Sequence, residues 1–221
     1  APLPPPSPAG PAVKLFVAGD RSQVGKSSTC LALLGACLQL GYTPGELAYI
    51  KPATQCEERQ PVADFCEAKG IQAVPVGPIV FYSGFTRSFL RGETASSADM
   101  LQDAAAAVDA LCAGRRLVVV DGVGYPAVGS ICGVSNAAVA RAVGAPVLLV
   151  GKRGVGDAVD SHNLNASFFA AHDVHVLGAV MNRVPDDDSS YYSLKKCEEA
   201  VSMYFEKFLP TQALYGYLPE V

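Results

Sequence analysis

One short segment restricts the possible folds of this chain more than any other. It begins with the apolar run Lys14–Ala18, continues with GDRSQVGKSSTC, and enters a helical pattern over Lys26–Leu40 that stops at Gly41. A buried strand, a glycine-containing loop and a helix N-terminus, in this order, form a cradle of backbone N–H groups for phosphate oxygens. The spacing is G-x5-GKS, one residue longer than the common G-x4-GK[ST] pattern. The alternative is a glycine turn with a surface lysine.

The residue types in this loop suit a bound triphosphate. The glycines let the backbone approach oxygen atoms, and Lys26 can neutralise phosphate charge. Ser27 offers a hydroxyl to Mg²⁺. We therefore expect a P-loop NTPase domain with ATP and Mg²⁺ as its ligands. The predicted phosphate-binding residues are Gly19, Ser22, Gln23, Val24, Gly25, Lys26, Ser27 and Ser28.

The rest of the chain alternates strand-like and helix-like segments. The strand-like runs are nearly all apolar, which is typical of strands buried on both faces of a parallel sheet. The clearest helix is Ser97–Cys112, before which Ser96 and Asp99 form a possible capping box. The alternation predicts one doubly wound α/β domain over residues 13–221, with a mostly parallel sheet flanked by helices. The predicted strands are Lys14–Ala18, Leu47–Lys51, Leu117–Asp121, Val147–Val150, Val176–Met181 and Ala213–Tyr217.

The composition of the chain argues against several kinds of binding partner and site. The net charge is -4 and no Lys/Arg cluster is longer than two residues, which argues against nucleic-acid binding through a basic face. No apolar run approaches the ~20 residues that span a bilayer. The seven Cys form no C-x-x-C pair, which disfavours a zinc site or a disulfide framework and makes the cytoplasm the expected location. Residues 1–12 are half proline and predict a disordered tail.

A carboxylate follows another apolar run. RRLVVVDGVG places Asp121 at the predicted carboxyl end of a strand. A nucleotide site needs such a carboxylate to hold Mg²⁺, directly or through water. The alternative is a turn or helix-capping aspartate, since DG is a common turn dipeptide. The glycines at Gly122 and Gly124 would let the following loop pass close to phosphate or substrate.

Further motifs follow in order along the chain. YIKPATQ carries Lys51, PVADF carries Asp64 and GAVMNRV carries Asn182, and the chain closes with GYLPEV. Together with GDRSQVGKS, this ordered set resembles the dethiobiotin synthetase family, which has GTDTEVGKT at the loop. The resemblance spans about residues 13–221. It extends to the cobyrinic and hydrogenobyrinic acid a,c-diamide synthases and to the nucleotide-binding domain at the front of some phosphotransacetylases.

The resemblance implies a role for each matching residue. Lys26 would neutralise the β- and γ-phosphates, and Lys51 would reach the γ-phosphate or the carboxylated substrate. For Lys51 the alternative is a solvated lysine before a proline turn. Asn182 would contact the adenine edge, because an amide donates and accepts at once, and the alternative is a turn residue. The ligands of Mg²⁺ would be Ser27, Asp64 and Asp121.

The resemblance also implies a reaction. A carbamate or carboxylate oxygen would attack the γ-phosphate of ATP, and the resulting mixed anhydride would be closed or amidated by an amine, as in biotin biosynthesis. The chain would then be an ATP-dependent cyclo-ligase with a small-molecule substrate, acting as a homodimer. Two alternatives remain open. One is a non-catalytic, nucleotide-binding regulatory domain, and the other is a MinD-type ATPase that dimerises around ATP.

Two loop residues depart from the family motif. The family's Glu before V-G-K is Gln23 here, and its Asp is Arg21. An amide cannot hold a substrate ammonium as a carboxylate does, whereas Arg21 favours an anionic group and stands where MinD-type ATPases place their signature lysine. Elsewhere, the aromatic segment Gly77–Glu93 predicts either a substrate lid or a packed surface loop. The resemblance implies that the glycine-rich loop Gly122–Asn136 approaches the substrate across a dimer interface, with Tyr125, Ser130 and Gly133 as candidate contacts. His162 is expected to be a surface or core histidine.

Overall fold

A parallel sheet forms the centre of the molecule. The computed structural model describes residues 10–55, 60–185 and 193–220, so residues 1–9 of the predicted disordered tail lie outside this part of the chain. The sheet has seven strands in the order β4-β2-β6-β1-β7-β8-β9, and its described pairings are all parallel. Its strands are β1 (Val13–Gly19), β2 (Leu47–Ile50), β4 (Gln72–Val74), β6 (Leu117–Asp121), β7 (Val147–Gly151), β8 (Val176–Val184) and β9 (Ala213–Pro219).

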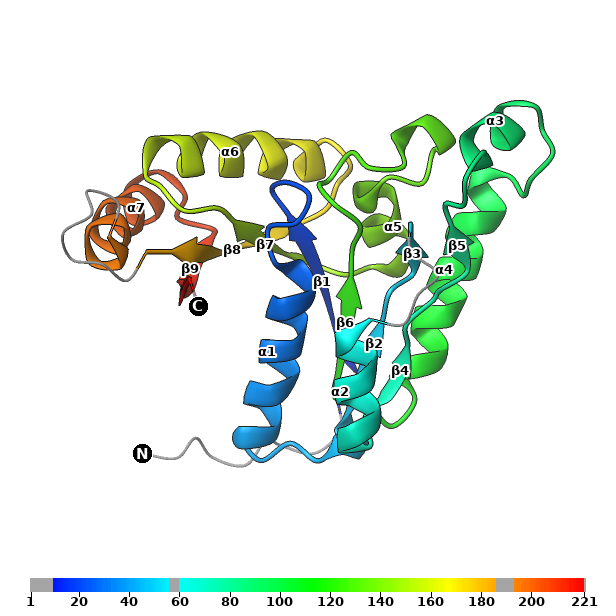
Figure 1. Cartoon of the computed structure of the whole chain (residues 1–221), viewed down its shortest axis with the longest axis horizontal. Helices are drawn as coiled ribbons and strands as arrows, with labels where there is room; N and C mark the ends of the chain where they lie inside the picture. Colours follow the sequence, from blue (N-terminus) through cyan, green and yellow to red (C-terminus); the bar gives the residue numbers. More distant parts are fainter. Residues whose placement is uncertain (1–9, 56–59, 186–192, 221) are drawn as a thin grey trace.

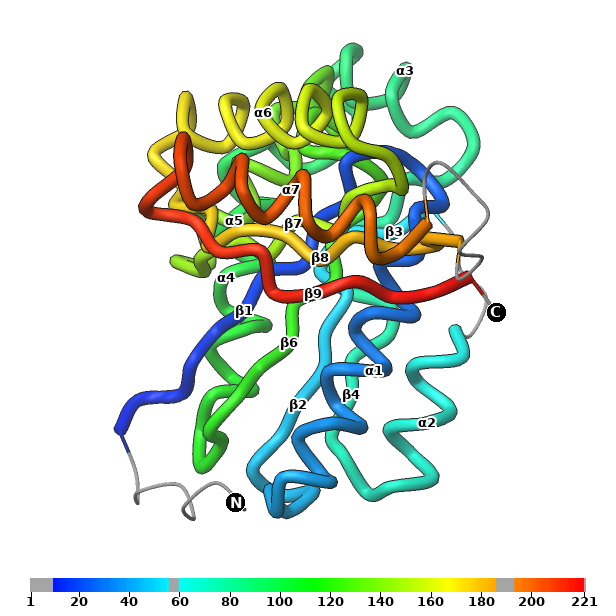
Figure 2. Tube along the Cα trace, turned by 90° about the vertical axis from the view of Figure 1, so that its left-hand side faces the viewer, coloured from blue at the N-terminus to red at the C-terminus, as the bar shows by residue number. Residues whose placement is uncertain are grey.

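Helices cover both faces of this sheet. On one face, α1 (Lys26–Gln39) and α2 (Pro61–Lys69) lie side by side (Figures 1 and 2). The helices that pack on the other face are α4 (Ser97–Cys112), α5 (Asn136–Val143), α6 (Gly156–Ala170) and α7 (Leu194–Phe208). This is the doubly wound α/β fold that the alternation of apolar runs and helical segments predicted, and that prediction is confirmed.

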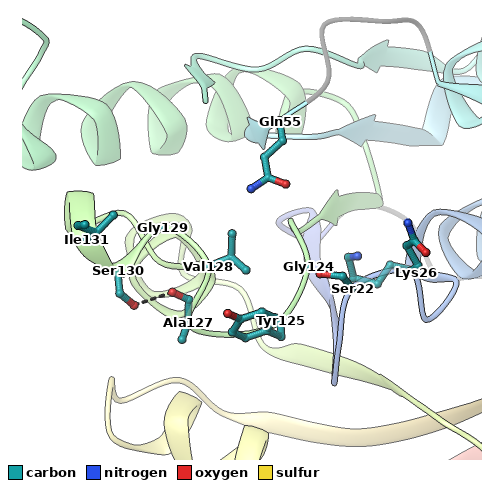
Figure 3. A pocket seen from close by; sticks show the side chains of 11 residues that line it. Ser22, Lys26, Gln55, Gly124, Tyr125, Ala127, Val128, Gly129, Ser130 and Ile131 are labelled. Carbon is teal, nitrogen blue, oxygen red and sulfur yellow. Dashed lines mark hydrogen bonds between the residues drawn. The ribbon is translucent and has the colours of Figure 1, made fainter. Parts of the chain in front are cut away.

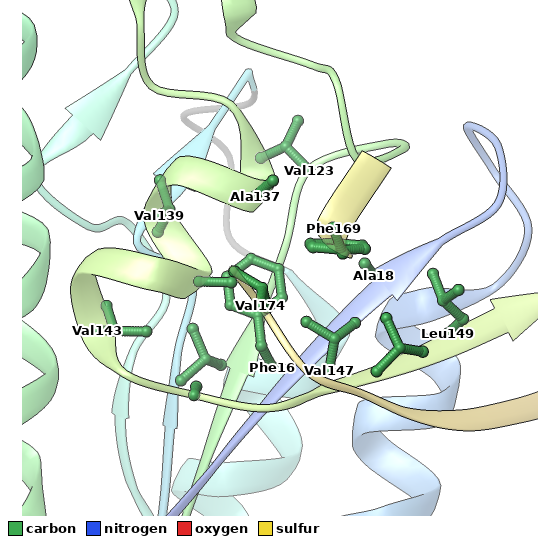
Figure 4. Close-up of a cluster of buried hydrophobic side chains, with 14 of the residues drawn as sticks. Phe16, Ala18, Val123, Ala137, Val139, Val143, Val147, Leu149, Phe169 and Val174 are labelled. Carbon is green, nitrogen blue, oxygen red and sulfur yellow. The ribbon is translucent and has the colours of Figure 1, made fainter. Parts of the chain in front are cut away.

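The central strand shows why its sequence is apolar throughout. Phe16 and Ala18 point into the cluster beneath α5 and α6, where they pack with Val143 and Phe169 (Figure 4). Val17, between them in sequence, joins the separate cluster beneath α1 and α2. Side chains alternate between the two faces of a strand, so a strand covered on both faces needs apolar residues at every position.

The strand order brings distant segments to one edge of the sheet. β1 pairs with β6 on one side and β7 on the other, and β6 also pairs with β2. Val17 is opposite Asp121, and Ile50 is opposite Val120. Because the carboxyl ends of parallel strands share an edge, the loops that follow β1, β2 and β6 meet there, as ligand-binding loops do in open α/β sheets.

Most predicted elements are present with small shifts at their ends. Every predicted strand is found, and α4 has the predicted bounds with the capping box of Ser96 and Asp99. Helix α1 ends at Gln39, one residue before the predicted Leu40. The sequence did not predict β4 or the small second sheet of β3 (Ala53–Thr54) and β5 (Ile79–Val80), because runs this short carry no readable periodicity. Among the described residues, no helix is long and apolar enough to cross a membrane.

The aromatic segment after β5 packs on the body of the molecule. It includes α3 (Phe85–Leu90), in which Phe85 is buried and meets Phe81 edge to face at 5.4 Å between ring centroids. Arg87 and Arg91 point away and are exposed. Of the two interpretations of this segment, a substrate lid or a packed surface loop, the structure favours the packed surface loop.

Candidate functional site

The loop between β1 and α1 is shaped by two glycines. Gly25 has φ +96, and a Cβ there would overlap the side-chain amide of Asn182. At Gly19 a Cβ would lie 2.7 Å from the main-chain oxygen of Arg21 and 2.7 Å from the Val24 side chain. A side chain at either position would displace the loop, so the requirement for glycine is steric at both. Gln23 has φ +59, a left-handed conformation that is unfavourable for a residue with a Cβ.

Asp121 is the centre of a buried polar cluster at the end of β6. Its side chain is fully buried, and its Oδ2 accepts hydrogen bonds from Ser27 Oγ at 2.9 Å and from Tyr49 OH at 2.9 Å. Lys51 Nζ lies 3.5 Å from the same oxygen, and the Lys51 side chain is only 11% exposed. Lys51 is thus held inside the site, and its interpretation as a solvated lysine before a proline turn is wrong. Among the described residues, Asp121 Oδ1 has no hydrogen-bond partner.

Burial sets the protonation states around this carboxylate. The pKa of Lys26 is lowered, first by burial and then by the charge of Lys51, while Asp121 opposes the shift. The pKa of the Tyr49 hydroxyl is raised, mainly by burial and then by the charge of Asp121. Burial and Asp121 also raise the pKa of the Cys30 thiol beneath the site. Tyr49 and Cys30 therefore stay neutral, and the Tyr49 hydroxyl acts as a donor to the carboxylate.

Two cavities open on the loop. One, of about 440 Å³, is lined by Arg21, Val24, Lys152, Arg153, Asp157, Asn182, Arg183 and Glu220 in addition to Ser22 and Gln23. We call it the Asn182 cavity. The other, of about 600 Å³, is lined by Lys26, Gln55, Gly124, Tyr125, Ala127, Val128, Gly129, Ser130 and Ile131, again with Ser22 and Gln23. We call it the Lys26 cavity. Ser22 and Gln23 line both, so this part of the loop separates the two spaces.

The Lys26 cavity is bounded by the loop that follows β6. Figure 3 shows Gln55, after β3, on the side of the cavity opposite Val128 and Tyr125. Asn136 holds this loop, since its Oδ1 accepts from Val123 N at 2.9 Å and its Nδ2 donates to Tyr125 O at 2.8 Å. The glycine-rich loop thus lies beside a cavity next to the phosphate loop, and its contact with a substrate stays a prediction.

An irregularity in β8 lies at the wall of the Asn182 cavity. The register of β8 against β9 shifts between Met181 and Val184, and Arg183 has φ +57. Irregularities of this kind re-aim side chains at sheet edges. Asn182 Nδ2 donates to Val24 O at 2.7 Å, which ties the end of β8 to the phosphate loop. Asn182 lies within β8 and not in a turn, and its buried side chain has a definite partner, so its interpretation as a turn residue is wrong.

A second buried carboxylate anchors the loop from the other side. Asp20 Oδ2 accepts from Ser161 Oγ at 2.9 Å and from Lys152 N at 3.3 Å. Its main-chain oxygen accepts from Asn165 Nδ2 at 3.2 Å. These contacts fasten the loop to α6, which lies beside it (Figure 1). Sequence reasoning gave Asp20 no role. Its hydrogen-bond partners stand more than 130 positions away, with separations of 132, 141 and 145, so no local pattern could reveal them.

Other candidates lie outside this cluster. Asp64 is exposed in the first turn of α2, and the hydrogen bonds that join Ser27 to Asp121 do not include it. Its role as a Mg²⁺ ligand stays a prediction. His162 is buried, with Nε2 2.7 Å from Gln212 Oε1 and its ring against Phe205, so it is a core histidine.

Asp121 suits a divalent cation. A buried carboxylate oxygen without a donor is costly, and a cation, or a water held by one, would satisfy Oδ1. Ser27 supplies a hydroxyl beside it. No group of three His, Cys, Asp or Glu side chains in the described ranges could hold a metal by itself. A cation here would therefore depend on phosphate oxygens for further ligands, as in other nucleotide sites.

Solved structures with the same fold are nucleotide-binding proteins. The signal recognition particle receptor FtsY from Elizabethkingia anophelis, solved with GDP, aligns with a TM-score of 0.56 at 15% identity. The alignment covers 98% of this chain and 60% of the FtsY chain. A ParA family ATPase from Chlorobium tepidum TLS aligns with a TM-score of 0.51 at 10% identity, over 95% of this chain and 85% of the other. At these identities the likeness shows the P-loop fold alone.

Comparisons of the sequence with known proteins identify the family. Residues 13–220 match a family model described as an AAA domain. An ATP-dependent dethiobiotin synthetase BioD from Anaeromyxobacter sp. (strain K) is 31% identical over 192 residues, which cover 80% of this chain and 79% of the relative. The synthetase of the same name from Anaeromyxobacter dehalogenans (strain 2CP-1 / ATCC BAA-258) is 29% identical over 190 residues, with the same coverage. The chain therefore belongs to the dethiobiotin synthetase family of P-loop proteins.

Proposed function

We propose that this protein is a Mg·ATP-dependent ligase of the dethiobiotin synthetase kind, which activates a carbamate or carboxylate by transfer of the γ-phosphoryl group. The observation that carries the proposal is the pair of cavities that meet at Ser22 and Gln23. Phosphoryl transfer needs the attacking and leaving oxygens roughly in line, on opposite sides of the transferred group. A loop with one cavity on each side would let a nucleotide and an acceptor approach the transferred group from opposite sides.

The nucleoside would occupy the Asn182 cavity. Asn182 has its amide nitrogen engaged by Val24 O, which leaves its side-chain oxygen to accept a hydrogen bond from an exocyclic amine such as that of adenine. Arg21, Lys152, Arg153 and Arg183 give this cavity more positive than negative side chains, since Asp157 and Glu220 are its acidic lining residues. A nucleoside that carries phosphates would be favoured there.

The phosphates would lie along the loop, near the two lysines. Lys26 is mostly buried at the start of α1, where backbone N–H groups of the helix N-terminus also face an anion. Lys51 directly follows β2, the strand that pairs with β6, and its Nζ lies 3.5 Å from the Asp121 oxygen that also accepts from Ser27. Positive groups fixed in a partly buried site stabilise charge that develops in the transition state. Ser27 and Asp121, with Asp64 as a further predicted ligand, would hold Mg²⁺, which neutralises charge on the β- and γ-phosphates.

The acceptor would occupy the Lys26 cavity. Lys26 stands at its loop end, with apolar side chains such as Val128 and Ile131 and the polar groups of Gln55 and Ser130 elsewhere on its wall. This arrangement fits a small molecule with an oxyanion directed toward the phosphates and an apolar body. Tyr125 and Ile131 remain exposed at the rim, which supports the homodimer as part of the proposal, because a second copy could cover them.

Phosphate release from Mg·ATP tests the proposed function. We expect release to increase when diaminopelargonic acid and bicarbonate are added, and to vanish in Lys26→Ala. ATP binding without substrate-stimulated release would favour the regulatory domain. ATP-dependent change in oligomeric state, seen by size-exclusion chromatography without stimulated release, would favour the MinD-type switch. Stimulated release in wild type that persists undiminished in Lys26→Ala would overturn the assignment of the loop.

A further inference from the structure

Tyr49 is a fully buried hydroxyl for which the proposed reaction has no use. It lies in the middle of β2 and donates to Asp121 Oδ2 at 2.9 Å. It lines neither the Asn182 cavity nor the Lys26 cavity, so a nucleotide or acceptor in these cavities would not touch it. A tyrosine hydroxyl needs a partner when it is buried, and here that partner is the carboxylate of the site.

The two oxygens of Asp121 have unequal surroundings. Oδ2 receives the hydroxyls of Ser27 and Tyr49 and lies 3.5 Å from Lys51 Nζ. Oδ1 is buried without a described hydrogen-bond partner. The two hydroxyl donors come from different elements, α1 and β2, so they restrict rotation of the carboxylate plane. The carboxylate therefore has one oxygen bound by protein donors and one buried oxygen without such a donor.

From this asymmetry we infer that Tyr49 is a positioning residue, which holds Asp121 so that Oδ1 is left for the divalent cation that accompanies the nucleotide. The inference rests on the proposed function in that it assumes a Mg·ATP site. Ser27 is itself a predicted cation ligand, so its hydroxyl has two tasks. Tyr49 has only one, and its donation to Asp121 does not depend on what the loop binds. Hydrogen bonds to a metal-binding side chain commonly change metal affinity by 10–100-fold.

The test is the Mg²⁺ dependence of ATP binding, measured by calorimetry on the full chain. In wild type, Mg²⁺ should raise ATP affinity above that seen in EDTA. In Tyr49→Phe, the Mg²⁺ concentration that gives half of this enhancement should rise roughly tenfold. Affinity in EDTA should be unchanged, and high Mg²⁺ should restore wild-type affinity. Tyr217→Phe is the matched control, because it removes a hydroxyl that donates to Cys197 O at 3.4 Å, outside the site.

The variant should fold, because the change removes no carbon atom and Ser27 still donates to Oδ2. If thermal unfolding shows a loss of stability, the Mg²⁺ dependence is measured at a temperature below the unfolding transition of the variant. Adding Tyr49→Phe to Asp121→Asn should shift the Mg²⁺ dependence no further than Asp121→Asn alone, since Tyr49 is argued to act through that carboxylate.

An unchanged Mg²⁺ requirement in a folded Tyr49→Phe protein would overturn the inference. So would an equal shift in Tyr217→Phe, which would mean a general structural effect, or the absence of any Mg²⁺ effect in wild type. Failure of the proposed ligase reaction is seen separately. In that case Mg²⁺ would still enhance ATP binding through Tyr49 and Asp121, while diaminopelargonic acid and bicarbonate would not stimulate phosphate release.

Discussion

Asn182 donates a hydrogen bond from its side-chain nitrogen to the main-chain oxygen of Val24 at 2.7 Å. The bond joins a strand near one end of the sheet order to the phosphate loop at its centre, across 158 positions of sequence. It also gives the amide a fixed orientation, with the nitrogen toward the loop. A residue that would contact the base thus takes part in holding the phosphate site.

Asn182→Asp tests this double role. The change replaces the donor by a second acceptor facing Val24 O, so we expect the free energy of unfolding to fall by about 1–3 kcal/mol. ATP affinity should fall roughly tenfold, which corresponds to about 1.4 kcal/mol, because the phosphate loop loses the hydrogen bond that holds Val24 O. Urea unfolding and calorimetry measure the two effects. Asn163→Asp is the control, because Asn163 donates to Tyr204 OH between α6 and α7, away from the loop. Equal losses in both variants would contradict the role of Asn182.

Gly25→Ala should abolish ATP binding. The added Cβ is strained at φ +96 and also overlaps the amide of Asn182, so the loop must move. Gly41→Ala is a matched control at φ +93, where a Cβ meets nothing within 4 Å and only the backbone strain of about 1–2 kcal/mol applies. ATP binding retained in Gly25→Ala, or lost in Gly41→Ala, would show that the steric argument is incorrect.

Gln23→Gly should stabilise the protein and weaken function. Glycine adopts φ +59 without penalty, so the free energy of unfolding should rise by about 1 kcal/mol. The amide that lines both cavities is lost at the same time, so ATP-dependent activity should fall. Asp173→Gly, at φ +58 and far from the loop in sequence, should give a similar gain without a change in activity. Chemical denaturation and the phosphate-release assay check both. No gain in stability at Gln23 would mean that its side chain compensates for the strain.

Lys26→Met should stabilise the nucleotide-free protein at pH 7 while abolishing ATP binding. The pKa of Lys26 is lowered by burial, so the unfolded chain holds this proton more readily than the folded one. The resulting cost is present at pH values below the folded pKa and disappears as the pH rises toward about 10. The gain from Lys26→Met should shrink over that range in urea unfolding. Lys195→Met, on the exposed side of α7, is the control for removal of a lysine outside the site. A Lys26→Met protein less stable than wild type at pH 7 would mean that attraction to Asp121 outweighs burial.

The parts of the site that could be predicted are those encoded in short segments. Lys26 and Ser27 follow a glycine loop directly after an apolar run, and Asp121 directly follows another. Strand–helix alternation then placed these segments at one sheet edge, because parallel strands end together. Lys51 was predicted from the family resemblance, and its burial against Asp121 needed the structure.

The parts that could not be predicted depend on contacts between distant segments. Tyr49 looks like any aromatic residue of a buried strand, and only the pairing of β2 with β6 brings its hydroxyl to Asp121. In the sequence Asp20 looks like a solvated loop residue, and only the packing of α6 beside the loop gives its carboxylate the Ser161 hydroxyl as a partner. A possible signal was available in both cases. A phenol inside an aliphatic run and an aspartate inside a phosphate loop each demand a buried partner.

The shared wall of the two cavities has a practical consequence for inhibitor chemistry. Ser22 and Gln23 form a narrow partition, so a phosphonate bridge laid over the loop could connect a nucleoside on one side to an acceptor mimic on the other. Joining two modest binders raises affinity through their effective concentration, provided the linker spans the gap. Selectivity would have to come from the acceptor half, which would contact Tyr125, Val128 and Ile131, because phosphate loops are common to many ATPases.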